Sequence, residues 1–127
     1  MIPILLAAAM AAPTTLADMR WHRRVLLVSA PHANDPGIVA QRRALAGWDE
    51  EARNRDLTIV SVIGNHVDGA TDRAASLRKR FRLPESGFVA ILIGKDGGEK
   101  MRSAKPIVPE VLAETIDAMP MRRAGQQ

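Results

Sequence analysis

The chain has 127 residues, a formal net charge of +4 at pH 7 and no cysteine. This length suits one domain and is too short for two. The absence of cysteine excludes disulfides, thiolate nucleophiles and thiolate-ligated metals. Apolar residues make up 46% of the chain and charged residues 25%, a globular composition that excludes an intrinsically disordered chain.

The first seventeen residues carry no charge and contain an apolar run from Ile2 to Ala12. Thr15-Leu16-Ala17 follows the run and has the small-x-small form of a signal-peptidase site. We therefore interpret residues 1–17 as a secretory signal peptide and predict a periplasmic or secreted protein. The run is shorter than the roughly 20 residues that span a bilayer, so no transmembrane segment is predicted.

From residue 25 onward, strand patterns alternate with helix patterns. Short continuous apolar runs indicate buried strands. Asp35 followed by Pro36 predicts a helix start, and Thr71 or Asp72 is expected to cap the next helix. Between the second strand and that helix, the segment NHVDGATD is predicted to be a loop. The predicted strands are 25–28, 57–63, 88–93 and 99–103, and the predicted helices run from 36 to about 54, from the 71–72 cap to about 81, and from 109 to the proline at 120.

The segment Gly94-Lys95-Asp96-Gly97-Gly98 separates the last two predicted strands, and Asp-Gly in that position is typical of a tight hairpin turn. The order of elements is therefore β-α-β-α-β-β-α, with one parallel crossover, one antiparallel hairpin and a closing helix. This order predicts an α/β, thioredoxin-like fold with a four-stranded mixed sheet and helices on both faces. We expect a single domain over residues 18–123 and a flexible tail at 124–127.

Several segments resemble the family catalogued as domain of unknown function 4174, over almost the whole chain after the leader. Among them are WHRRVLLVSAP and RDLTIVSV, and the most specific are IGKDGG leading to Lys100 and Arg102, and IDAMPMRR at 116–123. The resemblance implies a thioredoxin- or peroxiredoxin-like fold. It also implies distant kinship with domains of animal extracellular matrix proteins of the sushi-repeat and coiled-coil-domain-containing-80 type. It implies no particular reaction, so no catalytic residue is carried over.

In thiol oxidoreductases of this fold, the catalytic cysteines follow the first strand, at a helix N-terminus that lowers their pKa. Here that position is occupied by residues 29–35, SAPHAND, which contain no thiol. Thioredoxin, peroxiredoxin and glutaredoxin chemistry are therefore excluded. A Ser29/His32/Asp35 triad is disfavoured, because no nucleophile-elbow motif surrounds the serine. His32, Asn34 and Asp35 remain candidates for binding.

The first two strands are expected to be parallel neighbours, so that their C-terminal ends share one edge of the sheet. His32 and Asp35 would then lie near His66 and Asp68, and we call these four residues the loop rim. Two imidazoles and two carboxylates suit Zn²⁺ or Cu²⁺. The spacing matches no compact metal motif, however, and such residues commonly turn or cap the chain. Metal binding is therefore an alternative, and no cofactor is predicted.

Lys95, Lys100 and Arg102 along the hairpin are candidates for a basic patch that binds an anionic partner, with a solvated face as the alternative. Nucleic acid is not expected, because an exported protein with few aromatic residues lacks the stacking platforms of single-strand binders. The sequence favours an exported, cysteine-free, non-catalytic module that binds a protein, a polyanion or a cell-envelope component. The alternative is a metal- or ligand-dependent enzyme that uses the loop rim.

Overall fold

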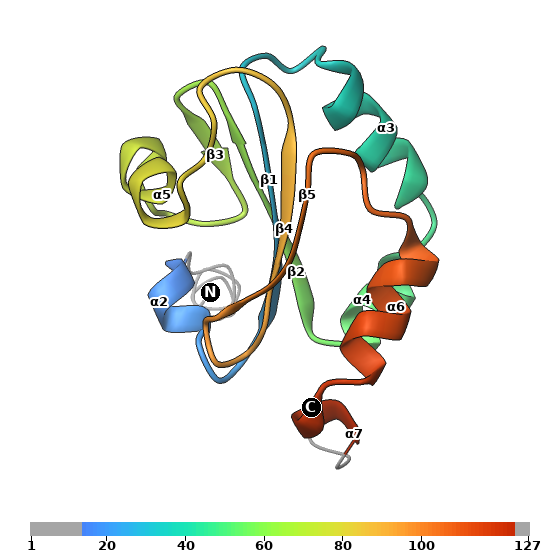
Figure 1. Ribbon diagram of the computed structural model, residues 1–127. Helices are drawn as coiled ribbons and strands as arrows, with labels where there is room; N and C mark the ends of the chain where they lie inside the picture. Colours follow the sequence, from blue (N-terminus) through green and yellow to red (C-terminus); the bar gives the residue numbers. More distant parts are fainter. Residues whose placement is uncertain (1–13, 124–127) are drawn as a thin grey trace, which may run out of the picture.

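A five-stranded mixed sheet forms the middle layer of the molecule (Figure 1). The computed structural model describes residues 14–123, and the strands lie in the order β3-β2-β1-β4-β5. β1 is parallel to β2 and antiparallel to β4, and β3 and β5 are antiparallel edge strands. The strands are β1 (Arg24–Ala30), β2 (Leu57–Ile63), β3 (His66–Asp68), β4 (Val89–Ile93) and β5 (Glu99–Ser103). The α/β class predicted from the sequence is confirmed.

Helices cover both faces of the sheet, because the central strands are apolar on both sides. Side chains alternate between faces along a strand, so Val25 and Leu27 of β1 pack with α2 and α5. Leu26 and Val28 pack with α3, α4 and α6 on the opposite face (Figure 1). The helices are α2 (Leu16–Met19), α3 (Pro36–Ala44), α4 (Asp49–Asn54), α5 (Ala74–Phe81), α6 (Pro109–Asp117) and α7 (Pro120–Arg123). None of the helices between residues 14 and 123 has the length and apolar character needed to cross a membrane.

The prediction of four strands is wrong, because the segment predicted as a loop contains β3. Its three residues fold back on the end of β2, and Val67 pairs with Val62. Gly64 makes the sharp return possible with a φ of +59°, a conformation that glycine adopts without steric cost. The strand escaped prediction because it is short and places one apolar residue between two polar ones, which is too little for a periodicity signal.

The helix predicted from 36 to about 54 is two helices, α3 and α4. Its predicted start is confirmed, since the Asp35 carboxylate accepts a hydrogen bond of 2.8 Å from the Gly37 N–H. The chain leaves α3 after Ala44, and Gly47, at φ +80°, turns it before α4 begins. Glycine adopts this positive φ without steric cost and so allows the chain to change direction there. The apolar spacing continues across this break, and for that reason the sequence pattern reads as one helix.

Residues 14–17, which the sequence interpretation assigns to the leader, pack into the domain. Thr15 caps α2 through a capping box with Asp18, and Leu16 and Met19 are each only 6% exposed. The Thr14 carbonyl also accepts a hydrogen bond of 2.9 Å from the backbone of the loop before α5. The rest of the predicted leader, residues 1–13, and the predicted tail, 124–127, lie outside the described residues.

The prediction that Thr71 or Asp72 caps α5 is wrong. The N-cap residue is Arg73, and it makes no side-chain capping hydrogen bond. The carboxylate of Asp72 instead accepts a hydrogen bond of 2.9 Å from the backbone N–H of Leu16. One acidic side chain thus joins the start of α2 to the start of α5, and it is not available to cap its own helix.

Candidate functional site

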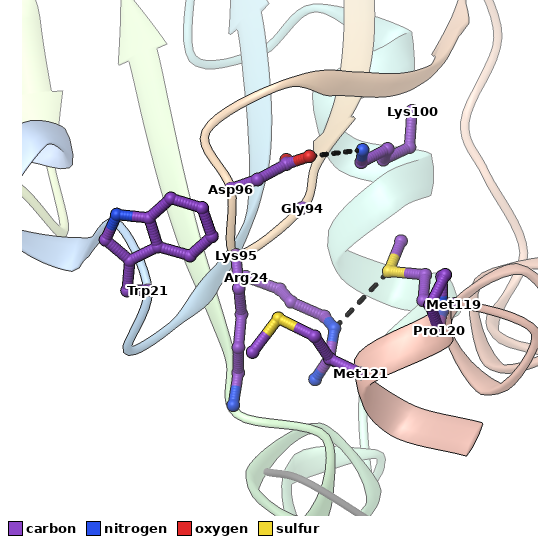
Figure 2. A pocket seen from close by; sticks show the side chains of 9 residues that line it. All are labelled: Trp21, Arg24, Gly94, Lys95, Asp96, Lys100, Met119, Pro120 and Met121. Atoms are coloured by element: carbon purple, nitrogen blue, oxygen red, sulfur yellow. Dashed lines mark hydrogen bonds and ion pairs between the residues drawn. The ribbon is translucent and has the colours of Figure 1, made fainter. Parts of the chain in front are cut away.

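A pocket of about 370 Å³ opens at the end of the sheet where β1 begins and β4 ends (Figure 2). Its walls come from three places: the start of β1, the β4–β5 turn, and the segment that joins α6 to α7. We call it the Arg24 pocket, and its lining residues are Trp21, Arg24, Gly94, Lys95, Asp96, Lys100, Met119, Pro120 and Met121. Small-molecule sites occupy roughly 300–1,000 Å³, so this pocket is large enough for a small ligand.

Arg24 is the first residue of β1, and only 1% of its surface is exposed. Its Nη1 donates to the carbonyl oxygen of Arg55 at 2.7 Å, and its Nε contacts the sulfur of Met119 at 3.4 Å. Burial lowers the pKa of the guanidinium, whereas the negative charge of Asp56 acts in the opposite direction. Arginine nevertheless stays protonated in proteins. Across residues 14–123, no carboxylate forms an ion pair with Arg24.

Lys95 is the second buried cation of the pocket, with 4% of its surface exposed. Its Nζ lies 2.9 Å from Oδ2 of Asp56, which follows α4 in the chain. Asp56 has a φ of +53°, a left-handed conformation that Asp and Asn tolerate better than most residues. Its backbone carbonyl also accepts a hydrogen bond of 2.8 Å from the N–H of Arg24. The charge of Lys95 is thus matched by a carboxylate that the start of β1 helps to hold.

The remaining charges among the lining residues are paired as well. Lys100 Nζ lies 2.9 Å from Asp96 Oδ2, and this ammonium lowers the pKa of the Asp96 carboxyl. Asp117, near the mouth, accepts hydrogen bonds from Arg55 and Arg122 at 3.1 and 3.3 Å. Of the three cations that line the pocket in the described chain, Arg24 is therefore the one without a carboxylate partner.

Trp21 forms an exposed aromatic rim beside these charges, with 56% of its surface accessible. Its φ is +72°, which is uncommon for a bulky residue and costs conformational free energy. The backbone N–H of Trp21 donates to the carbonyl oxygen of Lys95, which fixes the rim to the β4–β5 turn. Met119 and Met121 face the pocket from the α6–α7 segment (Figure 2). A strained, exposed tryptophan opposite flexible thioethers is an arrangement that suits ligand contact.

The family described as Domain of unknown function (DUF4174) matches residues 15–125. The chain belongs to this family. The match begins at the N-cap of α2 and includes every residue that lines the Arg24 pocket. It also includes residues 15–17, in agreement with the packing of α2 into the domain.

The two segments most specific to the family resemblance meet at this pocket. Gly94, Lys95, Asp96 and Lys100 come from the IGKDGG hairpin, and Met119, Pro120 and Met121 come from the IDAMPMRR segment. These segments are distant in sequence, and the antiparallel pairing of β1 with β4 places the hairpin beside the start of β1. The segments that carry the resemblance most specifically therefore meet at the Arg24 pocket.

The loop rim lies at the other end of the sheet, with roughly 20 Å of β1 between it and the pocket. His32 and Asn34 are exposed in the turn after β1, and Asp35 caps α3. His66 and Asp68 contact each other across β3, at 3.1 Å. Between residues 14 and 123, no group of three or more His, Cys, Asp or Glu side chains is arranged to hold a metal ion. The structure thus does not bring the four residues of the loop rim together as one site.

The three cations of the predicted hairpin patch are separated by the fold. Lys95 and Lys100 line the Arg24 pocket, whereas Arg102 lies at a different surface. The Arg102 guanidinium contacts both carboxylate oxygens of Glu99, at 3.1 and 3.0 Å, and donates to the carbonyl oxygen of Phe81 at the end of α5. Each of the three cations has a carboxylate partner, so they form no uncompensated basic surface.

Sequence reasoning missed Arg24, Trp21, Met119 and Met121 as site residues. Arg24 stands in the polar segment WHRR directly before a strand, where a charged residue is normally exposed. Its burial is a consequence of the sheet register, which no local pattern encodes. One signal was available for the two methionines. The segments that carry the family resemblance most specifically are the hairpin and the segment with Met119-Pro120-Met121, and considering the two segments together could have predicted a shared site.

Asp117→Asn is expected to lower stability at neutral pH and to have a smaller effect in acid. Hydrogen bonding to Arg55 holds the pKa of Asp117 below its usual value of 3.8. The carboxylate therefore stabilises the fold above about pH 4, and this contribution is lost as the pH falls through the depressed pKa. The side chain is 47% exposed, so we expect less than about 1 kcal/mol. Urea unfolding of both proteins at pH 7 and pH 2.5 measures the difference in their free energies of unfolding. An equal difference at the two pH values would contradict a stabilising role of the ionised Asp117.

Proposed function

We propose that the protein is an exported, non-catalytic binding module that takes a small ligand in the Arg24 pocket. The observation that carries this proposal is one cavity, lined by three segments that are distant in sequence, with a buried arginine in its wall and an exposed, strained tryptophan at its edge. A concave site with an apolar lining and a few convergent polar groups is the usual form of a small-molecule site. Of the partner classes that the sequence favours, a cell-envelope component of low molecular weight suits a cavity of this size best.

We further propose that the fold is thioredoxin-like. The order β2-β1-β4-β5, with one parallel pair and one antiparallel hairpin, supports this, and β3 is then an addition at the edge of β2. In such a fold, the thiol chemistry of related enzymes belongs at the C-terminal end of β1. The pocket lies at the N-terminal end of β1, which supports a binding function separate from that chemistry.

Export is part of the same proposal and rests on the uncharged apolar N-terminus. A leader removed after Ala17 would take with it the cap of α2 and the buried Leu16. We therefore propose that cleavage leaves Thr14 and the cap of α2 in the mature chain. N-terminal sequencing of the exported protein should find a first residue at or before Thr14. A first residue of Asp18, or an intact Met1, would contradict this placement.

The alternative function, an enzyme that uses the loop rim, has no contact in its favour. The His32 ring is exposed and makes no hydrogen bond to any of residues 14–123. His66 and Asp68 contact each other but have no third ligating side chain beside them in this part of the chain. A loop histidine and a capping aspartate are fully accounted for by turn and helix-start chemistry. We therefore favour the pocket.

The proposal is tested with octanamide, a neutral apolar probe, on the Trp48→Phe variant, in which Trp21 is the only tryptophan. Saturable binding should shift the Trp21 emission to shorter wavelength, because the probe excludes water from the indole. Met121→Ala should weaken octanamide several-fold through lost apolar contact. Met101→Ala, which shortens a methionine outside the pocket, should not. No saturable shift, or equal weakening by both substitutions, would refute the site.

A further inference from the structure

We propose that the natural ligand of the Arg24 pocket is a monoanionic amphiphile, a small molecule with one carboxylate on an apolar body. The inference rests on the proposed function, because it specifies the ligand class of the same pocket. It is carried by three observations: the charges that line the pocket, the hydrogen bonds that Arg24 leaves unmade, and the apolar side chains at the mouth.

The charges favour a ligand with a single negative charge. Lys95 is paired with Asp56, and Lys100 with Asp96, so each of these pairs is neutral. Arg24 adds one positive charge, which is buried and has no ion-pair partner within residues 14–123. A buried cation of this kind carries a large desolvation penalty, and an anion at the same place offsets it. One carboxylate would balance the charges of the lining residues and Asp56.

The hydrogen bonds of Arg24 favour a carboxylate as the anionic group. Nη1 is bonded to a backbone carbonyl, whereas Nη2 has no partner among the described residues. Nε has the thioether of Met119, which is a weak acceptor, at 3.4 Å. Nε and Nη2 together form one side of the guanidinium fork, and a carboxylate binds such a fork through two parallel hydrogen bonds. The flexible Met119 side chain can rotate away to admit it.

The mouth of the pocket favours an apolar body on the ligand. Trp21, Met119, Pro120 and Met121 supply apolar surface there, and Trp21 is largely exposed (Figure 2). A cavity of about 370 Å³ holds a chain of several methylenes next to the head group. Each methylene that leaves water should tighten binding by roughly fourfold until the pocket is full.

The test compares three probes that share one chain and differ in head-group charge: octanoate, octanamide and octylammonium. Affinities are measured by Trp21 fluorescence in the Trp48→Phe protein. We expect octanoate to bind at least tenfold more tightly than octanamide, and octylammonium to bind more weakly than either. Arg24→Gln should remove most of the preference for octanoate and weaken octanamide far less than octanoate, and the retained octanamide binding also reports that the pocket is still folded. Arg24→Lys, which keeps the charge without the fork, should give an intermediate preference.

The control is Arg43→Gln, which removes an exposed arginine on α3 and should change no affinity. Equal, saturable binding of octanoate and octanamide would overturn the inference of an anionic ligand and leave the pocket as a binding site. A preference for octylammonium would overturn it in the same way. If none of the three probes binds saturably, both the inference and the proposed function fail. If the Arg24→Gln protein does not fold, the affinities of the three probes for the unsubstituted protein and for Arg24→Lys still show whether the pocket prefers an anionic head group.

Discussion

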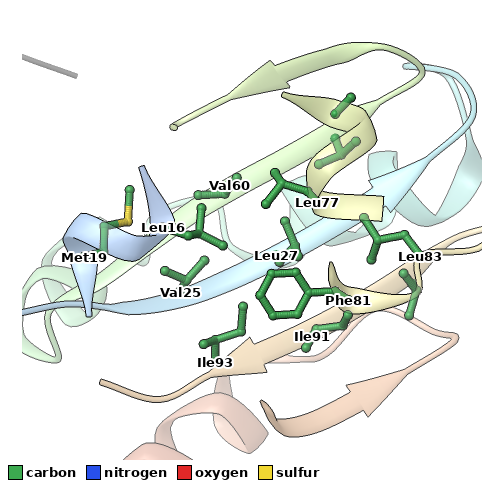
Figure 3. Packing of buried hydrophobic residues seen from close by; sticks show 13 residues of the cluster. Leu16, Met19, Val25, Leu27, Val60, Leu77, Phe81, Leu83, Ile91 and Ile93 are labelled. Atoms are coloured by element: carbon green, nitrogen blue, oxygen red, sulfur yellow. The ribbon is translucent and has the colours of Figure 1, made fainter. Parts of the chain in front are cut away.

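A chain that begins at Asp18 is expected to be less stable than one that begins at Thr14 by about 4 kcal/mol. The shorter chain loses the buried Leu16 side chain, worth roughly 2–3 kcal/mol, and the Thr15 cap, worth about 1 kcal/mol. It also loses the hydrogen bond from the Leu16 N–H to Asp72, worth about 1 kcal/mol. Figure 3 shows Leu16 and Met19 in the cluster to which β1, β2, β4 and α5 contribute. Urea unfolding of the two chains measures the difference.

A matched control separates the lost packing from the change of terminus. In the chain that begins at Thr14, Leu16→Ala should reproduce more than half of the destabilisation, because the cap and the backbone hydrogen bonds remain. Ala17→Ser, at an exposed position of α2, should leave the unfolding midpoint nearly unchanged. Equal midpoints for the two chains would show that α2 contributes nothing to the domain.

Asp56→Asn is expected to destabilise the protein by about 3 kcal/mol, although the two side chains have the same shape. The substitution leaves the Lys95 ammonium buried, 3% exposed, without its carboxylate. Asparagine tolerates the left-handed φ of +53° at this position, so backbone strain does not contribute. Chemical denaturation at pH 7 gives the free energy of unfolding of each protein.

Lys95→Met provides the comparison for this prediction. It removes the buried charge and leaves Asp56, whose side chain is 24% exposed, with access to water. We therefore expect a loss of about 1 kcal/mol or less, because replacing a buried ion by an apolar side chain is often nearly neutral. In the double variant, Lys95→Met should rescue most of the stability lost in Asp56→Asn. A loss in Asp56→Asn no larger than in Lys95→Met would contradict a buried ion pair.

Local chemistry in the sequence determines a large part of the fold. The run LTIVSVI at 57–63, rich in β-branched residues, predicts β2 with its observed bounds, and the Asp-Gly pair predicts the β4–β5 hairpin, where Gly97 has a φ of +84°. The Asp35 cap is likewise a local signal. The break between α3 and α4 could not be predicted, because the apolar spacing on both sides fits one helix. β3 depends on pairing with β2 and has almost no signal of its own.

The site was harder to predict than the fold because its parts meet only in three dimensions. The register that pairs Val25 with Ile93 brings the hairpin to Arg24, and α6 then carries Met119 to the same place. Lys95 and Lys100 were named from sequence as surface cations, whereas Lys95 is buried and paired. The residues after β1 attracted attention because polar residues follow an apolar strand, which is the pattern of a helix cap as much as of an active site.

The central claim, that ligand binding occurs at the Arg24 pocket and not at the loop rim, is tested most directly by mapping backbone amide shifts during an octanoate titration. The account predicts that the largest ¹H–¹⁵N changes occur in residues 21–24, 94–96 and 119–121. It predicts little change in residues 31–35 and 66–68. Saturable changes confined to the latter two segments, or no saturable change at any residue, would contradict it.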